Sequence, residues 1–388
     1  MRIVYVLTSL GIGGAERQAV TLAARMQQRG HSVGLLILGA HEPAEWPTGL
    51  PTVYLSLNRR RAWGVGLTGI LRAARFIRRF RPDIMHSHGF HGNIAARLLK
   101  AAWLDAAVIS TIHNIYEGGA MRMRVYRWTD RLCSRTVAVS QAVRDRFMAM
   151  GAVAAERCWV VENAVEEGEL VPNSARRASL RARMEVAGQF VWLTAGRLAR
   201  GKDYPNLLRA FARVREAGGD AQLWIAGRDL RGARAALEDL AAELKVEGIR
   251  WLGQRDDLPA LLDAADGFVL ASAWEGMPVA LAEAMAMAKP SVATSVGGVA
   301  DLLGNCGVLV EARAPEALAE AMLKVMGTGE EERLRLGCAA RKRILAGFTM
   351  RVRAVEWERM YREVLGADGP GTRAGLVRPG GKSDLTRR

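Results

Sequence analysis

Two glutamates separated by seven residues, Glu275 and Glu283, flank a Gly-x-Pro turn. The apolar run at residues 267–271 before them is typical of a buried strand, and the run rich in Ala, Met and Leu after Pro278 predicts a helix. Proline suits a first helical turn because it has no N–H to lose there, and the free amides after it form an anion site. One carboxylate can then face a reacting sugar, the other ribose hydroxyls, and the amides a phosphate. The alternative is a solvated helix with a capping glutamate.

A glycine loop, Gly11 to Gly14, follows the first predicted strand and opens a helix. It fails the dinucleotide fingerprint G-x-G-x-x-G, which requires glycine at the position of Glu16. The backbone of Gly13 and Gly14 can still approach a phosphate or a sugar closely. A plain turn is the alternative.

An arginine at the end of another predicted strand, Arg197, precedes Lys202 by five residues. A rigid guanidinium and a flexible ammonium can clamp a diphosphate between them and neutralise it as a leaving group. Two surface charges are the alternative, but that leaves the glycines beside them, Gly196 and Gly201, unexplained. Asp203 is expected to cap the following helix.

Histidines follow two predicted strands. His86, His88 and His91 are expected on one loop, where their spacing and the lack of a nearby carboxylate or thiol make a poor metal site. No metal site is therefore predicted. His113 follows the predicted strand at residues 108–112 and is the stronger candidate for chemistry, although a loop histidine can also simply bind neighbouring backbone.

The segment from Glu275 to Glu283 resembles the E-x7-E signature of retaining glycosyltransferases of family 4, the glycosyl transferases of group 1. The other motifs follow in the family's order over residues 1–366. The resemblance implies the GT-B fold, in which two Rossmann-like doubly wound α/β domains face each other across a cleft and a C-terminal helix crosses back to the N-terminal domain. It also implies a nucleotide diphosphate sugar as donor, with no cofactor and no metal.

The resemblance also implies roles for individual residues. His113 would point at the donor sugar and the reaction centre, and backbone near Gly227 and Gly253 would contact the nucleobase. The expected catalytic residues are His113, Arg197, Lys202 and Glu275. The expected donor-binding residues are Gly13, Gly14, Arg197, Lys202, Gly227, Gly253, Gly276, Met277, Pro278, Val279, Ala280 and Glu283.

Strand-like and helix-like runs alternate along a chain of 388 residues, which predicts two α/β domains. Ligands gather at the carboxyl ends of strands in such sheets, and the motifs follow predicted strands. The expected parts are an N-terminal Rossmann-like domain on the acceptor side (1–172), a C-terminal Rossmann-like domain on the donor side (173–347), a returning helix (348–366) and a disordered basic tail (367–388).

Composition narrows the class of protein. Half of the residues are apolar and 24% are charged, as in globular proteins, and the four cysteines form no C-x-x-C pair. A reduced, cytosolic compartment is expected. The N-terminus does not resemble a signal peptide, and no segment approaches the length of a transmembrane helix.

The net charge of +15 is concentrated in two arginine-rich windows, residues 59–81 and 122–135. In the first window, Ile70, Ala73 and Ile77 fall at helical spacing, which predicts an amphipathic helix with an arginine-rich outer face. Such a face suits peripheral attachment to the anionic inner leaflet of the plasma membrane. A solvated face is the alternative, and no motif supports nucleic-acid binding.

Together these observations predict a cytoplasmic, metal-independent transferase that moves a hexose, with retention, to a hydroxyl of a lipid-linked or polysaccharide acceptor in cell-surface glycan biosynthesis. A nucleotide-sugar epimerase of the same fold and a non-catalytic basic binding module are the alternatives. A nicotinamide oxidoreductase is disfavoured because its glycine fingerprint is broken. The base and sugar of the donor and the identity of the acceptor do not follow from these motifs.

Overall fold

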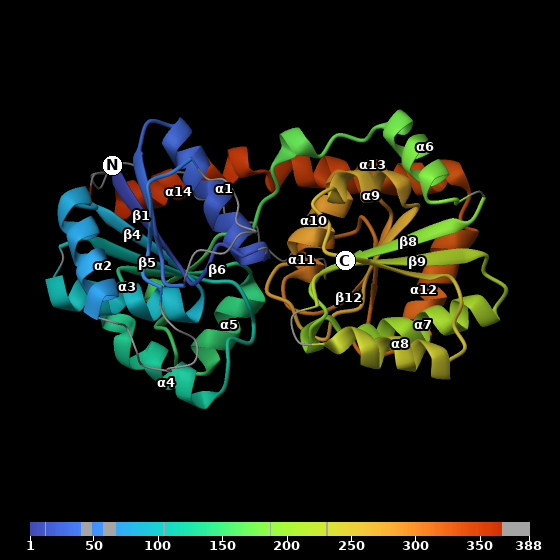
Figure 1. The fold of residues 1–388 in the computed structure, drawn as a ribbon, viewed down its shortest axis with the longest axis horizontal. Helices are drawn as coiled ribbons and strands as arrows, with labels where there is room; N and C mark the ends of the chain where they lie inside the picture. Colours follow the sequence, from blue (N-terminus) through green and yellow to red (C-terminus); the bar gives the residue numbers. More distant parts are fainter. Residues whose placement is uncertain are drawn as a thin grey trace, which may run out of the picture.

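The computed structural model describes residues 1–11, 13–39, 49–56, 67–103, 105–186, 188–229 and 232–366. Within them the chain forms two parallel β-sheets that lie side by side, each covered by helices (Figure 1). This architecture confirms the predicted pair of doubly wound α/β sheets. The predicted tail at 367–388 and Arg59, Arg60 and Arg61 lie outside the described residues.

The first sheet has the strand order β3-β2-β1-β4-β5-β6-β7, with every neighbouring pair parallel. Its strands are β1 (Arg2–Leu7), β2 (Ser32–Ile37), β3 (Thr52–Tyr54), β4 (Ile84–His88), β5 (Ala107–Ile112), β6 (Arg135–Ala138) and β7 (Cys158–Val160). The helices between them are α1 (Gly14–Gln28), α2 (Leu67–Phe80), α3 (Gly89–Trp103), α4 (Ala120–Thr129) and α5 (Gln141–Ala149).

The second sheet has the order β10-β9-β8-β11-β12-β13 and is also parallel. Its strands are β8 (Phe190–Ala195), β9 (Ala221–Ala226), β10 (Ile249–Gly253), β11 (Gly267–Leu270), β12 (Ser291–Thr294) and β13 (Val308–Val310). The accompanying helices are α6 (Ser174–Arg183), α7 (Tyr204–Glu216), α8 (Ala233–Glu243), α9 (Leu258–Ala264), α10 (Val279–Ala286), α11 (Val299–Leu303), α12 (Pro315–Gly327) and α13 (Glu330–Gly347).

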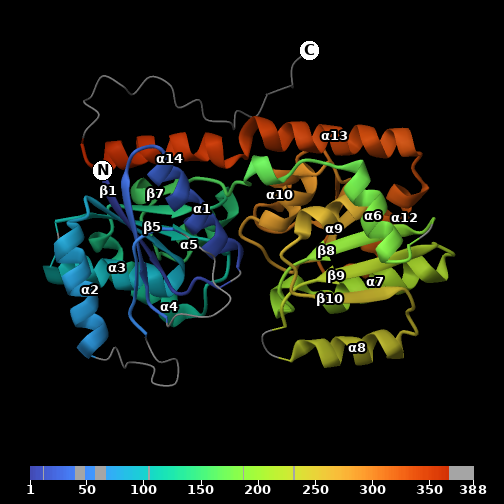
Figure 2. The same cartoon turned by 45° about the horizontal axis from the view of Figure 1, so that its top comes forward.

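The last helix, α14 (Met350–Val364), packs on the first sheet rather than on the second. Its Trp357 and Tyr361 are buried in the same cluster as Tyr5 of β1, and the hydroxyl groups of Tyr5 and Tyr361 lie 3.0 Å apart. Figure 2 shows α13 above the second half and α14 continuing above the first. The chain therefore returns to its N-terminal half after completing the second sheet.

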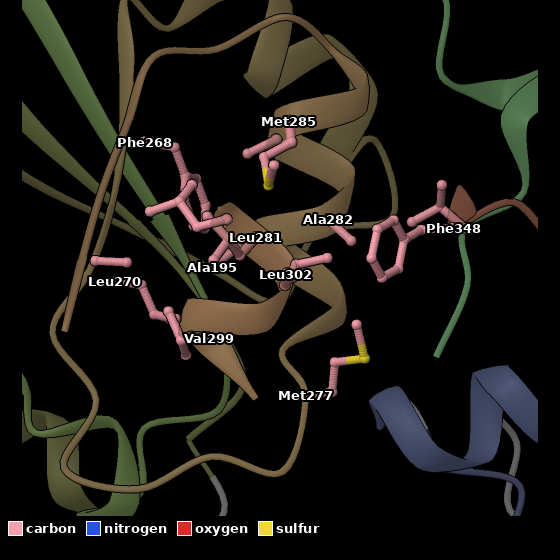
Figure 3. Packing of buried hydrophobic residues seen from close by; sticks show 14 of the residues in the cluster. Ala195, Phe268, Leu270, Met277, Leu281, Ala282, Met285, Val299, Leu302 and Phe348 are labelled. Carbon is pink, nitrogen blue, oxygen red and sulfur yellow. The ribbon is translucent and has the colours of Figure 1, made fainter. Parts of the chain in front are cut away.

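A single hydrophobic cluster joins the two halves. It contains Ile112 at the end of β5 as well as Leu281 of α10, and Phe348 at the start of the returning segment. Figure 3 shows the Phe348 ring facing Ala282 on α10, with Met277 beside them. Burial of these side chains stabilises the contact between the two sheets through the hydrophobic effect.

Two details of the sequence-based interpretation were wrong. The strand β4 extends to His88, so His86 and His88 are buried strand residues, and His91 lies in α3 rather than on a loop. All five residues of β4 are buried, and its polar residues at positions 86–88 interrupt the continuous apolar run that is typical of a buried parallel strand. The short edge strand β7 was not predicted, because three residues are too few to show a period.

Candidate active site

The two glutamates are both buried, which excludes a solvated helix. Helix α10 begins at Val279, and Pro278 stands at its N-cap in an extended conformation. Glu283 lies one turn inside the helix and is 5% exposed, while Glu275 on the preceding loop is 8% exposed. Buried carboxylates require partners, and each glutamate has one from a different part of the chain.

Glu275 is paired with Lys202. The Lys202 ammonium lies 2.5 Å from Glu275 Oε1, and the Ser272 hydroxyl donates to the same oxygen at 2.6 Å. Lys202 ends the short 3-10 turn Arg200–Lys202 after β8, and Ser272 follows β11, so the contact forms at the carboxyl ends of neighbouring strands. A strand-end ammonium and a strand-end carboxylate therefore meet at one point of the second sheet.

Glu283 is bonded across the two halves of the molecule. Arg17 of α1 donates to Glu283 Oε1 at 2.6 Å and also reaches Glu169 at 3.2 Å. Burial raises the pKa of Glu283, and the charge of Arg17 opposes that rise. The carboxylate is thus held at the start of α10 by a cation from the glycine-loop helix.

Close backbone contacts bring the glycine loop and the His113 loop to the same place. A Cβ on Gly14 would lie 3.5 Å from the Val279 side chain. A Cβ on Gly276 would lie 2.0 Å from the backbone oxygen of His113, so only glycine fits there. The Asn163 amide donates to the backbone oxygen of Met277 at 2.9 Å. Segments from both halves therefore surround the N-terminus of α10.

The remaining expected donor residues lie at adjacent strand ends of the second sheet. The amide of Gly227, after β9, donates to the oxygen of Gly253, at the end of β10, at 2.7 Å. Arg197, after β8, is exposed and has no ion pair among the described residues. Burial raises the pKa of Glu16 in the glycine-loop helix, and the charge of Arg197 opposes that rise.

His113 is held by two residues of the first half. Its Nε2 lies 2.8 Å from Nδ1 of His88, and the two rings stack with centroids 5.1 Å apart. Its backbone amide donates to Glu117 Oε1 at 3.3 Å. Burial lowers the pKa of His113 to about 4, so the imidazole is neutral at neutral pH.

Searches against protein families place both halves in the same group. A model of glycosyltransferase family 4 matches residues 12–169, and a model of glycosyl transferases group 1 matches residues 189–328. The chain belongs to glycosyltransferase family 4. It is an enzyme that transfers a sugar from a nucleotide sugar, in a family of retaining hexosyltransferases that are typically metal-independent.

Two curated relatives align with most of this family 4 enzyme. Glycogen synthase from Mycobacterium tuberculosis is 26% identical over 351 residues, which cover 84% of this chain and 79% of the relative. The Escherichia coli UDP-Gal:alpha-D-GlcNAc-diphosphoundecaprenol alpha-1,3-galactosyltransferase is 24% identical over 324 residues, which cover 77% of this chain and 80% of the relative.

A solved structure shows the same fold. Alr3699/HepE from Anabaena, in complex with UDP and glucose, aligns with a TM-score of 0.81 at 19% identity and covers 94% of this chain and 100% of that chain. Together with the parallel sheets and the returning α14, this likeness confirms the GT-B fold.

Four polar residues at the site were not predicted from the sequence. Arg17 follows the glycine loop by three positions, and Ser272 precedes Glu275 by three, so proximity to a motif was the available signal for both. His88 and Glu117 act on His113 from a neighbouring strand and from its own loop. Burial raises the pKa of Glu117 to about 7, although the Tyr126 hydroxyl donates to it at 2.7 Å.

The described residues hold neither a metal cluster nor a membrane-spanning helix. No group of three or more His, Cys, Asp or Glu side chains in them is arranged to bind a metal ion. None of the helices formed by these residues is long and apolar enough to cross a bilayer.

The buried histidines should make the stability of the family 4 enzyme sensitive to mild acid. Burial lowers the pKa of His86 and His88 well below the ordinary value, and that of His113 to about 4. The unfolded chain binds these protons near pH 6.5 and the folded chain does not, so the free energy of unfolding should fall as pH drops from about 6.5 towards 4. Urea denaturation at pH 7.5, 6.0 and 5.0 measures this loss.

His88→Asn is the matched variant for that experiment. It removes one buried titrating group, so its free energy of unfolding should decline less between pH 7.5 and 5.0 than that of the wild type. Equal declines in the two proteins would show that His88 does not contribute to the acid sensitivity.

Proposed function

We propose that this chain is a retaining hexosyltransferase that acts on a hydroxyl group of a lipid-linked or polysaccharide acceptor in cell-surface glycan biosynthesis. The observation that carries the proposal is the pairing of Lys202 with Glu275 beside the N-terminus of α10. This point of the structure combines a cation, a carboxylate and the free amides of a helix N-terminus. Such groups can stabilise the charges that develop when a nucleoside diphosphate leaves a sugar.

In the proposed mechanism the diphosphate binds between Arg197, Lys202 and the amides after Pro278. These groups stabilise the negative charge that grows on the leaving group, and no divalent metal is needed for that step. Glu275 faces the reacting sugar, where its carboxylate stabilises oxocarbenium character. Because the His113 imidazole is neutral, it can form a hydrogen bond with the sugar of the nucleotide sugar, either as donor or as acceptor, without adding charge to the site.

We assign the remaining donor contacts to residues around the same helix N-terminus and at the neighbouring strand ends. Glu283 binds the ribose hydroxyls, and the backbone at Gly227 and Gly253 lies beside the base. The acceptor enters from the first half, next to the glycine loop and His113. Its hydroxyl attacks on the face that the diphosphate leaves, and the departing phosphate accepts the hydroxyl proton, which retains the anomeric configuration.

Three relatives support the chemical classes of donor and acceptor. Alr3699/HepE was solved with UDP and glucose, which favours a uridine nucleotide as the first donor to test. The Escherichia coli relative is named for a diphosphoundecaprenol acceptor, and the mycobacterial relative is named for synthesis of a polysaccharide. These names support an acceptor that is either lipid-linked or a growing glycan.

A thermal-shift screen against UDP, GDP, ADP and their hexose conjugates tests the donor class. A ligand that binds only the folded state stabilises it by about 2.7 kcal/mol at one hundred times its Kd. We expect one nucleoside diphosphate and its sugar to raise the melting temperature clearly above the others. Absence of a shift with every nucleotide would contradict the proposed function.

The arginine-rich helix supports a membrane location for the acceptor. On α2, Ala73 and Ile77 are buried, whereas the arginines at positions 72, 75, 78 and 79 are exposed. Later in the same half, α4 exposes Met121 and Trp128, which are 59% and 66% exposed. Exposed arginines with exposed large apolar side chains suit the headgroup region of an anionic leaflet.

Sedimentation with lipid vesicles tests the membrane proposal. Each basic side chain near an anionic surface contributes about 1 kcal/mol, screened over a Debye length of about 10 Å at 0.1 M salt. The enzyme should therefore pellet with anionic vesicles at low salt, and remain in the supernatant with neutral vesicles or at high salt.

Charge reversal on α2 supplies the decisive comparison. Arg75→Glu with Arg79→Glu should reduce pelleting strongly, while Lys324→Glu with Arg359→Glu, which makes the same charge change on exposed positions of α12 and α14, should not. Equal pelleting of the two double variants would assign the binding to net charge rather than to the α2 face.

A further inference from the structure

A second groove, separate from the site around Lys202 and Glu275, lies on the C-terminal half beside the loops that carry these two residues. It has a volume of about 460 Å³ and is formed by the turn before α7, the first turns of α7, the loop after β11 and the segment between β13 and α12. Polar and aromatic side chains dominate its lining. They are Arg200, Asp203, Asn206, Arg209, Trp274 and Arg313.

The charge of the groove is positive. Arg200, Arg209 and Arg313 are exposed, and none of them forms an ion pair with another residue in the part of the chain that the structure describes. Asp203 is the acidic residue of the lining. Three guanidinium groups around one concavity favour an anion with several oxygens, since each can donate two parallel hydrogen bonds to a phosphate or carboxylate.

A buried amide in the lining lacks partners. Asn206 is 4% exposed, and neither its side-chain oxygen nor its side-chain nitrogen has a hydrogen-bond partner among the described residues. A buried polar group without a partner destabilises the fold, so its presence requires an explanation. A ligand whose hydroxyl groups reach this amide from the groove would supply the missing donor and acceptor.

Asp203 also departs from the role expected for it. It stands at the N-cap of α7 in a left-handed conformation, φ 48°, and its side chain makes no capping hydrogen bond. The prediction that it caps the helix was therefore wrong. Asp203 instead lines the groove, where a carboxylate can accept hydrogen bonds from hydroxyl groups.

An aromatic side chain forms another wall. Trp274 is half-buried, and its ring meets that of Tyr116 from the first half in an edge contact, with centroids 6.2 Å apart. A Cβ on Gly201 would lie 2.7 Å from the indole nitrogen, so glycine before Lys202 makes room for the indole. An indole offers a large apolar surface on which the C–H face of a sugar ring can pack.

We propose that this groove binds a sugar that carries a phosphate or carboxylate group, as a site distinct from that of the donor. The three arginines bind the anionic group, Asn206 and Asp203 bind hydroxyls, and the sugar ring packs on Trp274. A simple anion would contact only the arginines, and a neutral sugar would not need them. An anionic sugar, in contrast, would contact all six side chains. Trp274 precedes Glu275, and Gly201 precedes Lys202, so the groove adjoins the active site without sharing its charged groups.

Calorimetric titration in the presence of saturating UDP separates this groove from the donor site. Glucose 6-phosphate represents a sugar with a phosphate group, and glucuronate represents a sugar with a carboxylate group. Glucose alone and inorganic phosphate alone serve as controls for the sugar and for the anion. We expect at least one of the two anionic sugars to bind with one-to-one stoichiometry, at least tenfold more tightly than glucose or phosphate. Absence of binding by both, or binding that UDP abolishes, would overturn the proposal.

Two variants locate the bound sugar. Arg209→Ala with Arg313→Ala should raise the Kd of the anionic sugar at least tenfold and leave UDP binding unchanged. Arg146→Ala with Arg359→Ala removes the same charge from exposed positions on α5 and α14 and should change neither value. Equal affinities in the two double variants would also overturn the proposal.

Asn206→Leu distinguishes a binding role from a structural one. Replacing an unpartnered buried amide with an apolar side chain of similar size should be neutral or stabilising for the fold. The same change should weaken binding of the anionic sugar. Loss of stability with unchanged affinity would show that Asn206 serves the core of α7 and not the groove.

Discussion

Lys202→Ala should lower kcat for sugar transfer by about 10²- to 10³-fold, the loss typical of removing one group that stabilises developing negative charge. Lys202 is the cation paired with Glu275, and the flexible ammonium can turn from that carboxylate to the departing diphosphate. Steady-state kinetics with the donor chosen by the thermal-shift screen measure the effect. Circular dichroism and the melting temperature verify that the variant is folded.

The pairing with Glu275 calls for a second variant, because removing Lys202 leaves a buried carboxylate without its cation. Lys202→Ala combined with Glu275→Gln removes both charges. If the double variant regains stability but its kcat stays below that of Glu275→Gln alone, the additional loss belongs to the missing cation rather than to a disturbed fold. A folded Lys202→Ala enzyme with unchanged kcat would remove Lys202 from the catalytic site.

Glu275→Gln and Glu283→Gln should separate chemistry from donor binding. Glu275, which accepts from Lys202 and Ser272, is expected to act on the reacting sugar, so its amide variant should mainly lower kcat, by about 10²-fold. Glu283, which is bonded to Arg17, is expected to bind ribose hydroxyls, so its variant should mainly raise the donor KM, by about tenfold.

Both amides preserve the size of the carboxyl group, so each serves as the control for the other. The donor KM and kcat are measured for both variants under the same acceptor concentration. If the two effects are interchanged, the roles of the two glutamates are reversed. If both variants lose only stability, neither carboxylate contacts the donor.

Local sequence signals were sufficient for most of the elements that carry the site. The predicted strands at residues 108–112 and 267–271 agree with β5 and β11 to within one residue at each end, because buried parallel strands are short apolar runs bounded by turn residues. The strand-to-helix loops that hold Lys202, Glu275 and Pro278 were identified for the same reason. The burial of Ala73 and Ile77 under an exposed arginine face on α2 likewise followed from helical spacing.

Tertiary structure alone decided which of these groups meet. The contacts Lys202–Glu275, Arg17–Glu283 and His88–His113 join residues 73, 266 and 25 positions apart, and no local pattern encodes such pairings. The order of strands in each sheet and the return of α14 to the first half bring them together. The sequence by itself therefore determined the fold class and the types of groups at the strand ends, whereas packing determined their partners, their burial and the second groove.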